Sequence, residues 1–143
     1  MKYMRFDDKS TREQRLQKDK LAAFSDIWLM FTSQLPKFFV LGSDLCVDEQ
    51  LVAYCGRCSF RQYIPSKPAK YGIKIWWCCD SDTSYPLTAD IYLGKQKNAE
   101  TEIGQGARVV KTLTGPWQKS GRNVVGDNFF SLLSWQKSCF HTV

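Results

Sequence analysis

The segment 73–93 constrains the fold more than any other part of this sequence. Apolar residues recur at every second position on both sides of a polar turn at residues 80–83. The first run contains Ile73, Ile75, Trp77 and Cys79, and the second contains Leu87, Ala89, Ile91 and Leu93. A period of two is typical of strands with one buried face, and the Asp, Ser and Thr residues of the turn favour a tight reversal. The segment therefore predicts an antiparallel β-hairpin.

Further strands and helices are predicted on either side of this hairpin. Residues 45–54 form an apolar run bounded by glycines, and residues 123–126 are β-branched, so each predicts a strand. Residues 102–114 carry apolar side chains at helical spacing before a Gly-Pro pair, which predicts a helix that ends there. An amphipathic segment from Ser131 predicts a last helix. The resulting order β, β, β, α, β, α indicates an α/β domain with a mixed sheet.

Residues 1–40 predict a helical lead-in to this domain. Ser10 and Glu13 have the spacing of a capping box, so a first helix is expected to begin near Thr11. A stripe of apolar residues follows at helical spacing, and Pro36 is expected to end the helix that carries it. The stripe predicts a packing face, with an exposed interaction surface as the alternative. Its members are Leu21, Phe24, Ile27, Trp28 and Phe31.

Composition narrows the class of protein. The chain has 143 residues, of which 43% are hydrophobic and 14% aromatic, so it suits one folded domain rather than a disordered segment. No apolar run approaches the roughly 20 residues of a membrane span, and the start lacks the apolar core of a signal peptide. We therefore expect a nuclear or cytoplasmic protein that is not secreted and does not enter a membrane. Its six cysteines are then expected to be reduced thiols.

A basic segment predicts contact with nucleic acid. The net charge is +6, and the stretch from Arg57 to Lys74 holds five basic residues and no acidic one. Phe60, Tyr63 and Tyr71 are interleaved with them. We expect weak, sequence-indifferent contacts with the DNA backbone, and a solvated surface without a ligand is the alternative. The predicted DNA-binding residues are Arg57, Arg61, Lys67, Lys70 and Lys74.

The cysteines offer a minor alternative, a structural zinc site. Cys55 and Cys58 have ligand spacing, but a tetrahedral site needs two more ligands. Cys78 and Cys79 are adjacent on a predicted strand and are expected to point to opposite faces. The remaining candidates for the other two zinc ligands are Cys139 and His141, whose spacing is irregular. Zinc is therefore not expected.

Three runs of this sequence resemble the transposase domain of the piggyBac family, which are DDE-type transposases. They are residues 47–51 (VDEQL), residues 63–74 (YIPSKPAKYGIK), and residues 121–123 (GRN) leading to residues 127–130 (DNFF). The resemblance implies that residues 41–143 form the N-terminal part of a catalytic domain with an RNase H-like fold. It also implies an ancestral activity of Mg²⁺-dependent DNA cleavage and strand transfer, as in DNA recombination by a transposable element.

The resemblance also implies the site residues. Asp48 matches the first catalytic aspartate of the family and Asp127 the second, and both would bind the metal. In the implied fold, the strands that precede them lie side by side. Because ligands of open α/β sheets bind at the carboxyl ends of strands, the two aspartates are expected to meet there. Polar strand ends without a metal are the alternative.

The sequence departs from the family in two places. No match to the third aspartate or to the cysteine-rich DNA-binding domain is found, so we expect a truncated domain that is inactive alone. Residues 54–57 read Tyr-Cys-Gly-Arg where the family has Phe-Arg-Gly-Arg, and Cys55 thus replaces a phosphate-binding guanidinium. A piece of a longer active enzyme is one alternative. A non-catalytic domesticated module is the other, and it would bind DNA, associate with a full-length transposase, or self-associate through an exposed strand edge.

Overall fold

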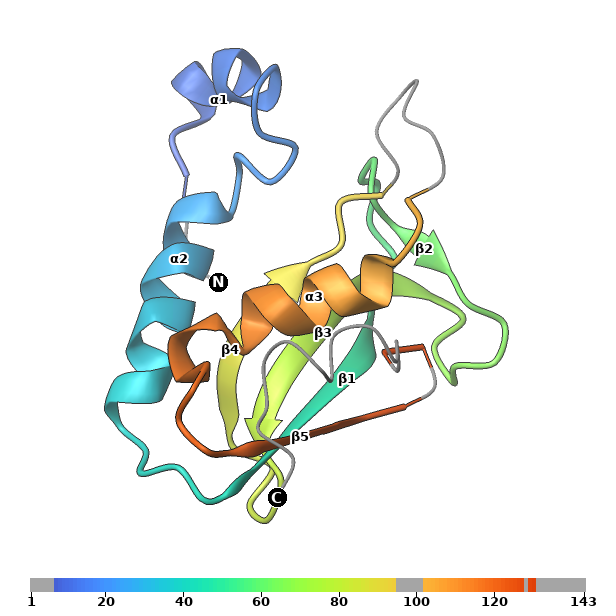
Figure 1. The fold of residues 1–143 in the computed structure, drawn as a ribbon. Coiled ribbons are helices and arrows are strands. Elements are labelled where there is room, and N and C mark those ends of the chain that lie inside the picture. Colours follow the sequence, from blue (N-terminus) through green and yellow to red (C-terminus); the bar gives the residue numbers. More distant parts are fainter. Residues whose placement is uncertain (1–6, 95–101, 128, 131–143) are drawn as a thin grey trace.

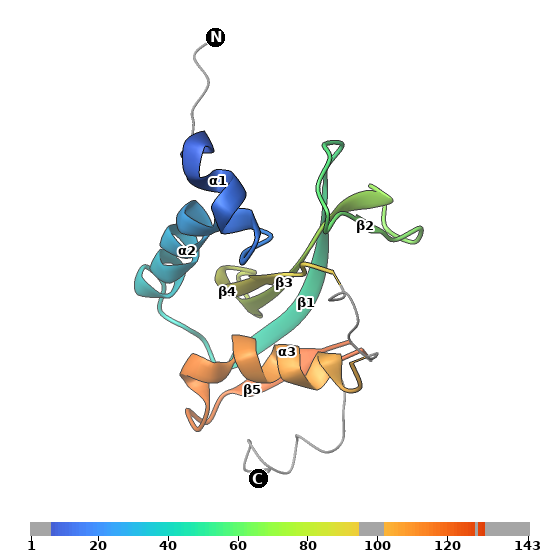
Figure 2. The same ribbon diagram turned by 90° about the horizontal axis from the view of Figure 1, so that it is seen from above.

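The computed structural model describes residues 7–94, 102–127, 129 and 130, and in them a mixed five-stranded sheet has helices on both faces (Figures 1 and 2). Three α-helices and two short 3-10 helices are described. In chain order, the elements are α1 (Lys9–Leu16), α2 (Ser25–Gln34), η1 (Leu35–Lys37), β1 (Asp44–Ala53), β2 (Gln62–Tyr63), β3 (Tyr71–Asp80), β4 (Pro86–Ile91), α3 (Gln105–Leu113), η2 (Gly115–Trp117) and β5 (Asn123–Gly126).

Strand β3 is the centre of the sheet. It pairs antiparallel with β1 along one edge, from Leu45↔Asp80 to Ala53↔Gly72. Its other edge pairs antiparallel with β4 and with the short β2. The predicted hairpin is therefore confirmed, because β3 and β4 are its two arms. Strand β5 lies parallel to β1 on the far side, which brings two distant segments of the chain together.

The alternation of side chains along the strands builds a core on each face of the sheet. One core lies between the sheet and α3, and the other lies on the side of α2, where the Trp28 ring meets Trp77 at 5.9 Å between centroids. Cys78 is fully buried in the first core and Cys79 is only half-buried, as expected for neighbours on a strand. The first core comprises Leu45, Val47, Trp76, Cys78, Leu87, Val109, Val110, Leu113 and Phe130, and the second comprises Phe60, Ile75 and Ile91.

The structure corrects one predicted helix start and adds one strand. Helix α1 begins at Lys9 and its cap is Asp8, whose Oδ1 accepts the backbone N–H of Ser10 at 2.9 Å, so Ser10 is not the cap. The α-helix that carries the stripe ends at Gln34, so the stop predicted at Pro36 is confirmed, and Pro36 lies in the first turn of the short 3-10 helix η1 that follows. Strand β2 was not predicted, since the prolines near it argue against a central strand but permit this two-residue edge strand. The helix predicted from Ser131 lies outside the described residues.

The stripe on α2 packs only in part. Leu21 and Trp28 lie against the second core, whereas Phe24 is 42% exposed and Phe31 is 48% exposed. Leu21 and Phe24 precede the helix, which begins at Ser25. The predicted packing face is therefore confirmed for part of the stripe.

Asp80, the last residue of β3, is hydrogen-bonded to the segment that precedes β1. Its side chain is buried, and its carboxylate accepts the N–H of Gly42 at 2.9 Å and that of Thr83 at 3.0 Å. The Thr83 hydroxyl donates to the same carboxylate at 2.8 Å, and these hydrogen bonds lower the pKa of Asp80 below its usual value. The charged form is thus the one that the fold stabilises.

Replacing Asp80 by asparagine is expected to destabilise the protein at pH 7 and to matter little in strong acid. Because the pKa of Asp80 is lowered on folding, its contribution is present above the unfolded value of about 3.9. That contribution is lost as the pH falls through the lower pKa of the folded state. Urea unfolding of both proteins at a series of pH values measures this. The exposed Asp82→Asn change is the control, and a deficit that persists unchanged in acid would contradict the assignment.

Candidate functional site

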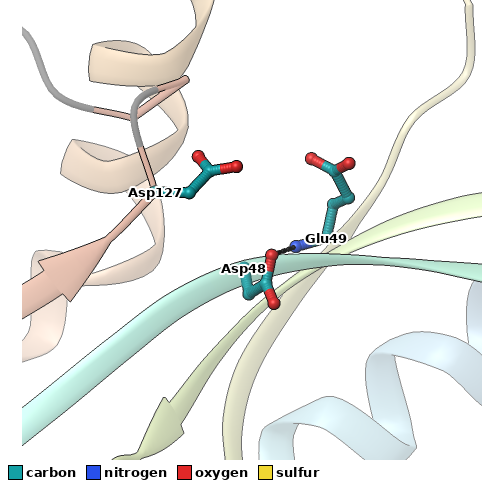
Figure 3. A group of neighbouring side chains, drawn as sticks. All are labelled: Asp48, Glu49 and Asp127. Atoms are coloured by element: carbon teal, nitrogen blue, oxygen red, sulfur yellow. Dashed lines mark hydrogen bonds between the residues drawn. The ribbon is translucent and has the colours of Figure 1, made fainter. Parts of the chain in front are cut away.

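Three carboxylates meet where β1 and β5 run side by side. One oxygen from each of Asp48, Glu49 and Asp127 lies within 4.8 Å of the others (Figure 3). The strand register explains this, because Val47 pairs with Gly126 in a parallel arrangement and Asp48 and Asp127 are the next residues of the two strands. Both aspartates are exposed to solvent and Glu49 is half-buried. The structure thus brings Asp48 and Asp127 together as expected.

Glu49 is the member of this group that the sequence did not predict. The adjacent carboxylates of Asp48 and Glu49 beside a basic, aromatic-rich loop suit a metal ion, but only Asp48 was assigned to the site. Alternation along a strand would point the two side chains to opposite faces. The Asp48 carboxylate instead turns back and accepts the backbone N–H of Glu49 at 2.6 Å. The Glu49 carboxylate lies 3.4 Å from Nζ of Lys67 and 3.6 Å from Nζ of Lys74. The signal in the sequence was that Glu49 and Asp48 are adjacent carboxylates next to a basic, aromatic-rich loop.

The Lys74 side chain is largely buried and lies next to the Glu49 carboxylate. Its side chain is 16% exposed, and its ammonium lies 5.4 Å from the centroid of Trp76 and 5.1 Å from that of Phe129. Aromatic faces attract cations, so the two rings and Glu49 together fix the charge in place. Lys74 therefore places a positive charge close to the carboxylate group.

The turn after β5 positions Asp127. The Asp127 carboxylate accepts the N–H of Phe129 at 2.9 Å, and its carbonyl accepts the N–H of Phe130 at 3.0 Å. The Phe130 side chain is 1% exposed and belongs to the core under α3. Gly106 of α3 faces this turn so closely that a Cβ there would lie 2.1 Å from the Phe129 carbonyl oxygen. The position of Asp127 thus depends on tight packing of the turn against α3.

The predicted basic segment is a hairpin loop beside this site. The loop between β2 and β3 closes through a hydrogen bond of 2.8 Å from the N–H of Ile64 to the carbonyl of Lys70. Lys67 is half-buried because it reaches Glu49. Lys74 is also not exposed, whereas the remaining side chains predicted to contact DNA are exposed, namely Arg57, Arg61 and Lys70. Their role in DNA binding stays a prediction.

The donor set of the site suits a hard divalent cation. All three ligand atoms are carboxylate oxygens, the kind that Mg²⁺ and Mn²⁺ prefer, and neither thiol nor imidazole takes part. Across residues 7–94 and 102–130 without 128, this is the one group of three acidic, cysteine or histidine residues close enough to share an ion. Cys139 and His141 of the alternative zinc site lie outside the described residues.

The thiols are expected to react with iodoacetamide in an order set by burial. Burial raises the pKa of Cys78 to about 12 and also raises the pKa values of Cys46 and Cys79. The thiolate is the reactive form, so Cys78 should label only when the protein unfolds, whereas the exposed Cys55 should label first. Mass spectrometry of the peptides at successive times measures the order. Rapid labelling of Cys78 in the folded protein would contradict the described core.

No helix within the described ranges has the length and hydropathy needed to cross a membrane.

Comparison with known proteins identifies relatives of the chain. The family model described as Transposase IS4 matches residues 1–135. A solved structure described as the cryo-EM structure of the piggyBac transposase synaptic complex with hairpin DNA is similar, with a TM-score of 0.84 and 40% sequence identity. The match covers 93% of this chain and 28% of that chain. This chain therefore corresponds to less than a third of the length of that transposase.

Proposed function

This chain belongs to the Transposase IS4 family and is a piggyBac-like transposase, and from that premise we propose that it supplies part of an RNase H-like catalytic domain for DNA cleavage and strand transfer. We assign Asp48 and Asp127 as the residues that bind the catalytic Mg²⁺. The observation that supports this most is the parallel register of β1 and β5, which sets the two exposed aspartates opposite each other. The proposed place of action is the nucleus, where the DNA is.

Each residue of the site has a distinct part in this proposal. Asp48 and Asp127 hold the cation with hard oxygen ligands on two rigid strands. When bound, Mg²⁺ would activate the attacking oxygen and neutralise charge on the phosphate. Glu49 stays paired with Lys67 and Lys74, which keeps its carboxylate oriented beside the aspartates. The exposed basic residues of the segment 57–74, Arg57, Arg61 and Lys70, contact the DNA backbone.

We further propose that these 143 residues do not carry out strand transfer by themselves. Two-metal phosphoryl transfer needs carboxylates that hold two cations roughly 3.5–4 Å apart. Among the described residues, the third carboxylate is Glu49, and two lysines already engage it. A strand-transfer assay with the purified chain, Mg²⁺ and a transposon-end duplex tests this. Joined products that disappear in the Asp48→Asn variant would contradict it.

A DNA-binding module without catalysis is the second candidate, favoured by the exposed basic residues near the loop. Its affinity for duplex DNA should fall steeply as salt rises, because each phosphate contact releases bound counterions. A filter-binding series across salt concentrations measures the slope. Absence of binding at the lowest salt would refute every DNA contact proposed for this chain.

Association with a second chain accompanies that candidate. In the described sheet β5 is the strand at one end, with a single partner strand, and such edges recruit other chains. We propose self-association or association with a full-length transposase through this edge. Light scattering of the purified chain over a range of concentrations measures the first. A monomer at all concentrations, together with no capture of a full-length relative, would refute the proposal.

Replacing Glu49 by glutamine is expected to strengthen DNA binding by roughly two- to fivefold at low salt. The change removes a negative charge that competes with phosphate for Lys67 and Lys74. The slope of the logarithm of the binding constant against the logarithm of the salt concentration should also become steeper by about 1, as expected when one more lysine contacts phosphate. Glu13→Gln on α1 makes the same change of charge and is the control. Weaker binding by Glu49→Gln would show instead that Glu49 holds the lysines in the orientation that DNA needs.

A further inference from the structure

Two exposed tyrosines form a pair at the edge of the sheet, outside the carboxylate site. Tyr63 of β2 and Tyr71 of β3 are register partners, and their ring centroids lie 4.7 Å apart. Tyr63 is 57% exposed and Tyr71 is 51% exposed, and neither ring packs against the two cores. The guanidinium carbon of Arg61 lies 5.2 Å from the Tyr71 centroid. Two large rings and a cation are therefore assembled at the surface without contributing to a core.

The position of the pair connects it to the carboxylates. Tyr63 and Tyr71 stand at the two ends of the loop 64–70, and Lys67 of this loop reaches Glu49. Lys70 is exposed beside Tyr71, and no acidic residue occurs between residues 57 and 74. The segment that carries the rings thus has only basic charges, and its Lys67 reaches the proposed catalytic site. A ligand that offers flat rings joined by negative charges complements both features.

We propose that Tyr63 and Tyr71 form a stacking platform for an unpaired nucleobase of a DNA strand whose phosphates contact Arg61 and Lys70. Bases within a duplex are already stacked on both faces, so an exposed ring selects a base that has left the stack. Stacking on aromatic side chains tolerates any base, because every base has a π-face. Tyr71 is contacted by both Tyr63 and Arg61, so Tyr63 offers the more open ring. The inference rests on the proposed DNA function and adds a preference for single-stranded over duplex DNA near the site.

The experiment compares two DNA probes with matched variants of Tyr63. One probe is a duplex with a single-stranded tail that carries 2-aminopurine, and the other is the same duplex with blunt ends. Tyr63→Leu removes the π-face and is expected to weaken binding of the tailed probe roughly tenfold. Tyr63→Phe keeps the ring and should bind as the natural protein does. Binding of the blunt duplex should be unchanged in both variants. The natural protein and Tyr63→Phe should quench the 2-aminopurine fluorescence strongly, and Tyr63→Leu should not.

The outcomes separate this inference from the proposed function. If both probes bind and neither affinity depends on Tyr63, the stacking platform is wrong but the proposed DNA function stands. The exposed tyrosine pair would then fit a contact with a protein partner. An equal loss on both probes also overturns it, because the ring would then act on the duplex. Failure of the natural protein to bind either probe overturns the DNA function and the inference together. Circular dichroism confirms that each variant is folded, and Tyr71→Leu, at the second ring, repeats the comparison if Tyr63→Leu fails to fold.

Discussion

Replacing Asp48 by asparagine is expected to abolish measurable divalent-cation binding by this chain, with a loss in affinity of at least roughly tenfold. The change removes one of the two exposed carboxylates that the β1–β5 register places opposite each other. Because Asp48 is exposed and pairs with no cation in the described structure, the fold should be unaffected. Calorimetric titration with Mn²⁺, which prefers the same oxygen ligands as Mg²⁺, measures the affinity.

The controls for this prediction use the geometry of a shared site. Asp127→Asn should cause a similar loss, and the double variant should lose little more than either single one, because both side chains bind the same ion. Asp82→Asn removes an exposed carboxylate from the β3–β4 turn and should bind Mn²⁺ normally. Unchanged binding by Asp48→Asn, or losses that add in the double variant, would contradict a common site.

Replacing Gly106 by alanine is expected to destabilise the protein by about 1–3 kcal/mol and to weaken cation binding as well. Within a helix, alanine is normally the more stable residue by roughly 1 kcal/mol, so the predicted effect has the opposite sign. The reason is that the new Cβ would lie 2.1 Å from the Phe129 carbonyl oxygen, and a backbone atom cannot rotate away. Either α3 or the turn that holds Asp127 must move.

Gly115 provides the matched control for this substitution. A Cβ at Gly115 meets no atom within 4 Å, so Gly115→Ala should leave stability within about 0.5 kcal/mol of the natural value. Thermal unfolding measures stability, and titration with Mn²⁺ measures the effect on Asp127. If Gly106→Ala were as stable as Gly115→Ala and bound the cation equally well, the described contact between α3 and the turn would be wrong.

The hairpin of the sheet could be predicted from the sequence because apolar residues recur at every second position of its two arms. The hairpin of β3 and β4 follows from residues that pack against a core at every second position, such as Ile75 and Leu87. The pairing of β1 with β5 could not be derived in this way. Residues 44–47 and 123–126 are far apart in the chain, and only the family resemblance implied that they are neighbours. The meeting of Asp48 and Asp127 was therefore an inference from family rather than from pattern.

The site itself was less predictable, because a side chain can turn away from the face of the sheet to which alternation along the strand assigns it. Glu49 forms a carboxylate pair with Asp48 in the sequence but was not assigned as a ligand, and in the structure all three carboxylates gather within 4.8 Å. Lys74 was grouped with the DNA-binding residues because it ends a stretch of five basic residues without an acidic one. The structure places it against Trp76 and Phe129, a contact that requires β3 and the turn after β5 to be adjacent. Such tertiary contacts leave no local mark in the sequence.

Iron-mediated cleavage can show whether Asp48 and Asp127 hold one cation between β1 and β5. Fe²⁺ takes the place of Mg²⁺ at oxygen-ligand sites, and with ascorbate and peroxide it cuts the backbone beside the ion. If both aspartates bind one cation, we expect two cuts in the natural protein, one near Asp48 and one near Asp127. Excess Mg²⁺ should suppress both cuts together. Both should also vanish in the Asp48→Asn variant. A cut at only one of these positions, or cuts that survive the loss of Asp48, would contradict a cation shared by the two strands.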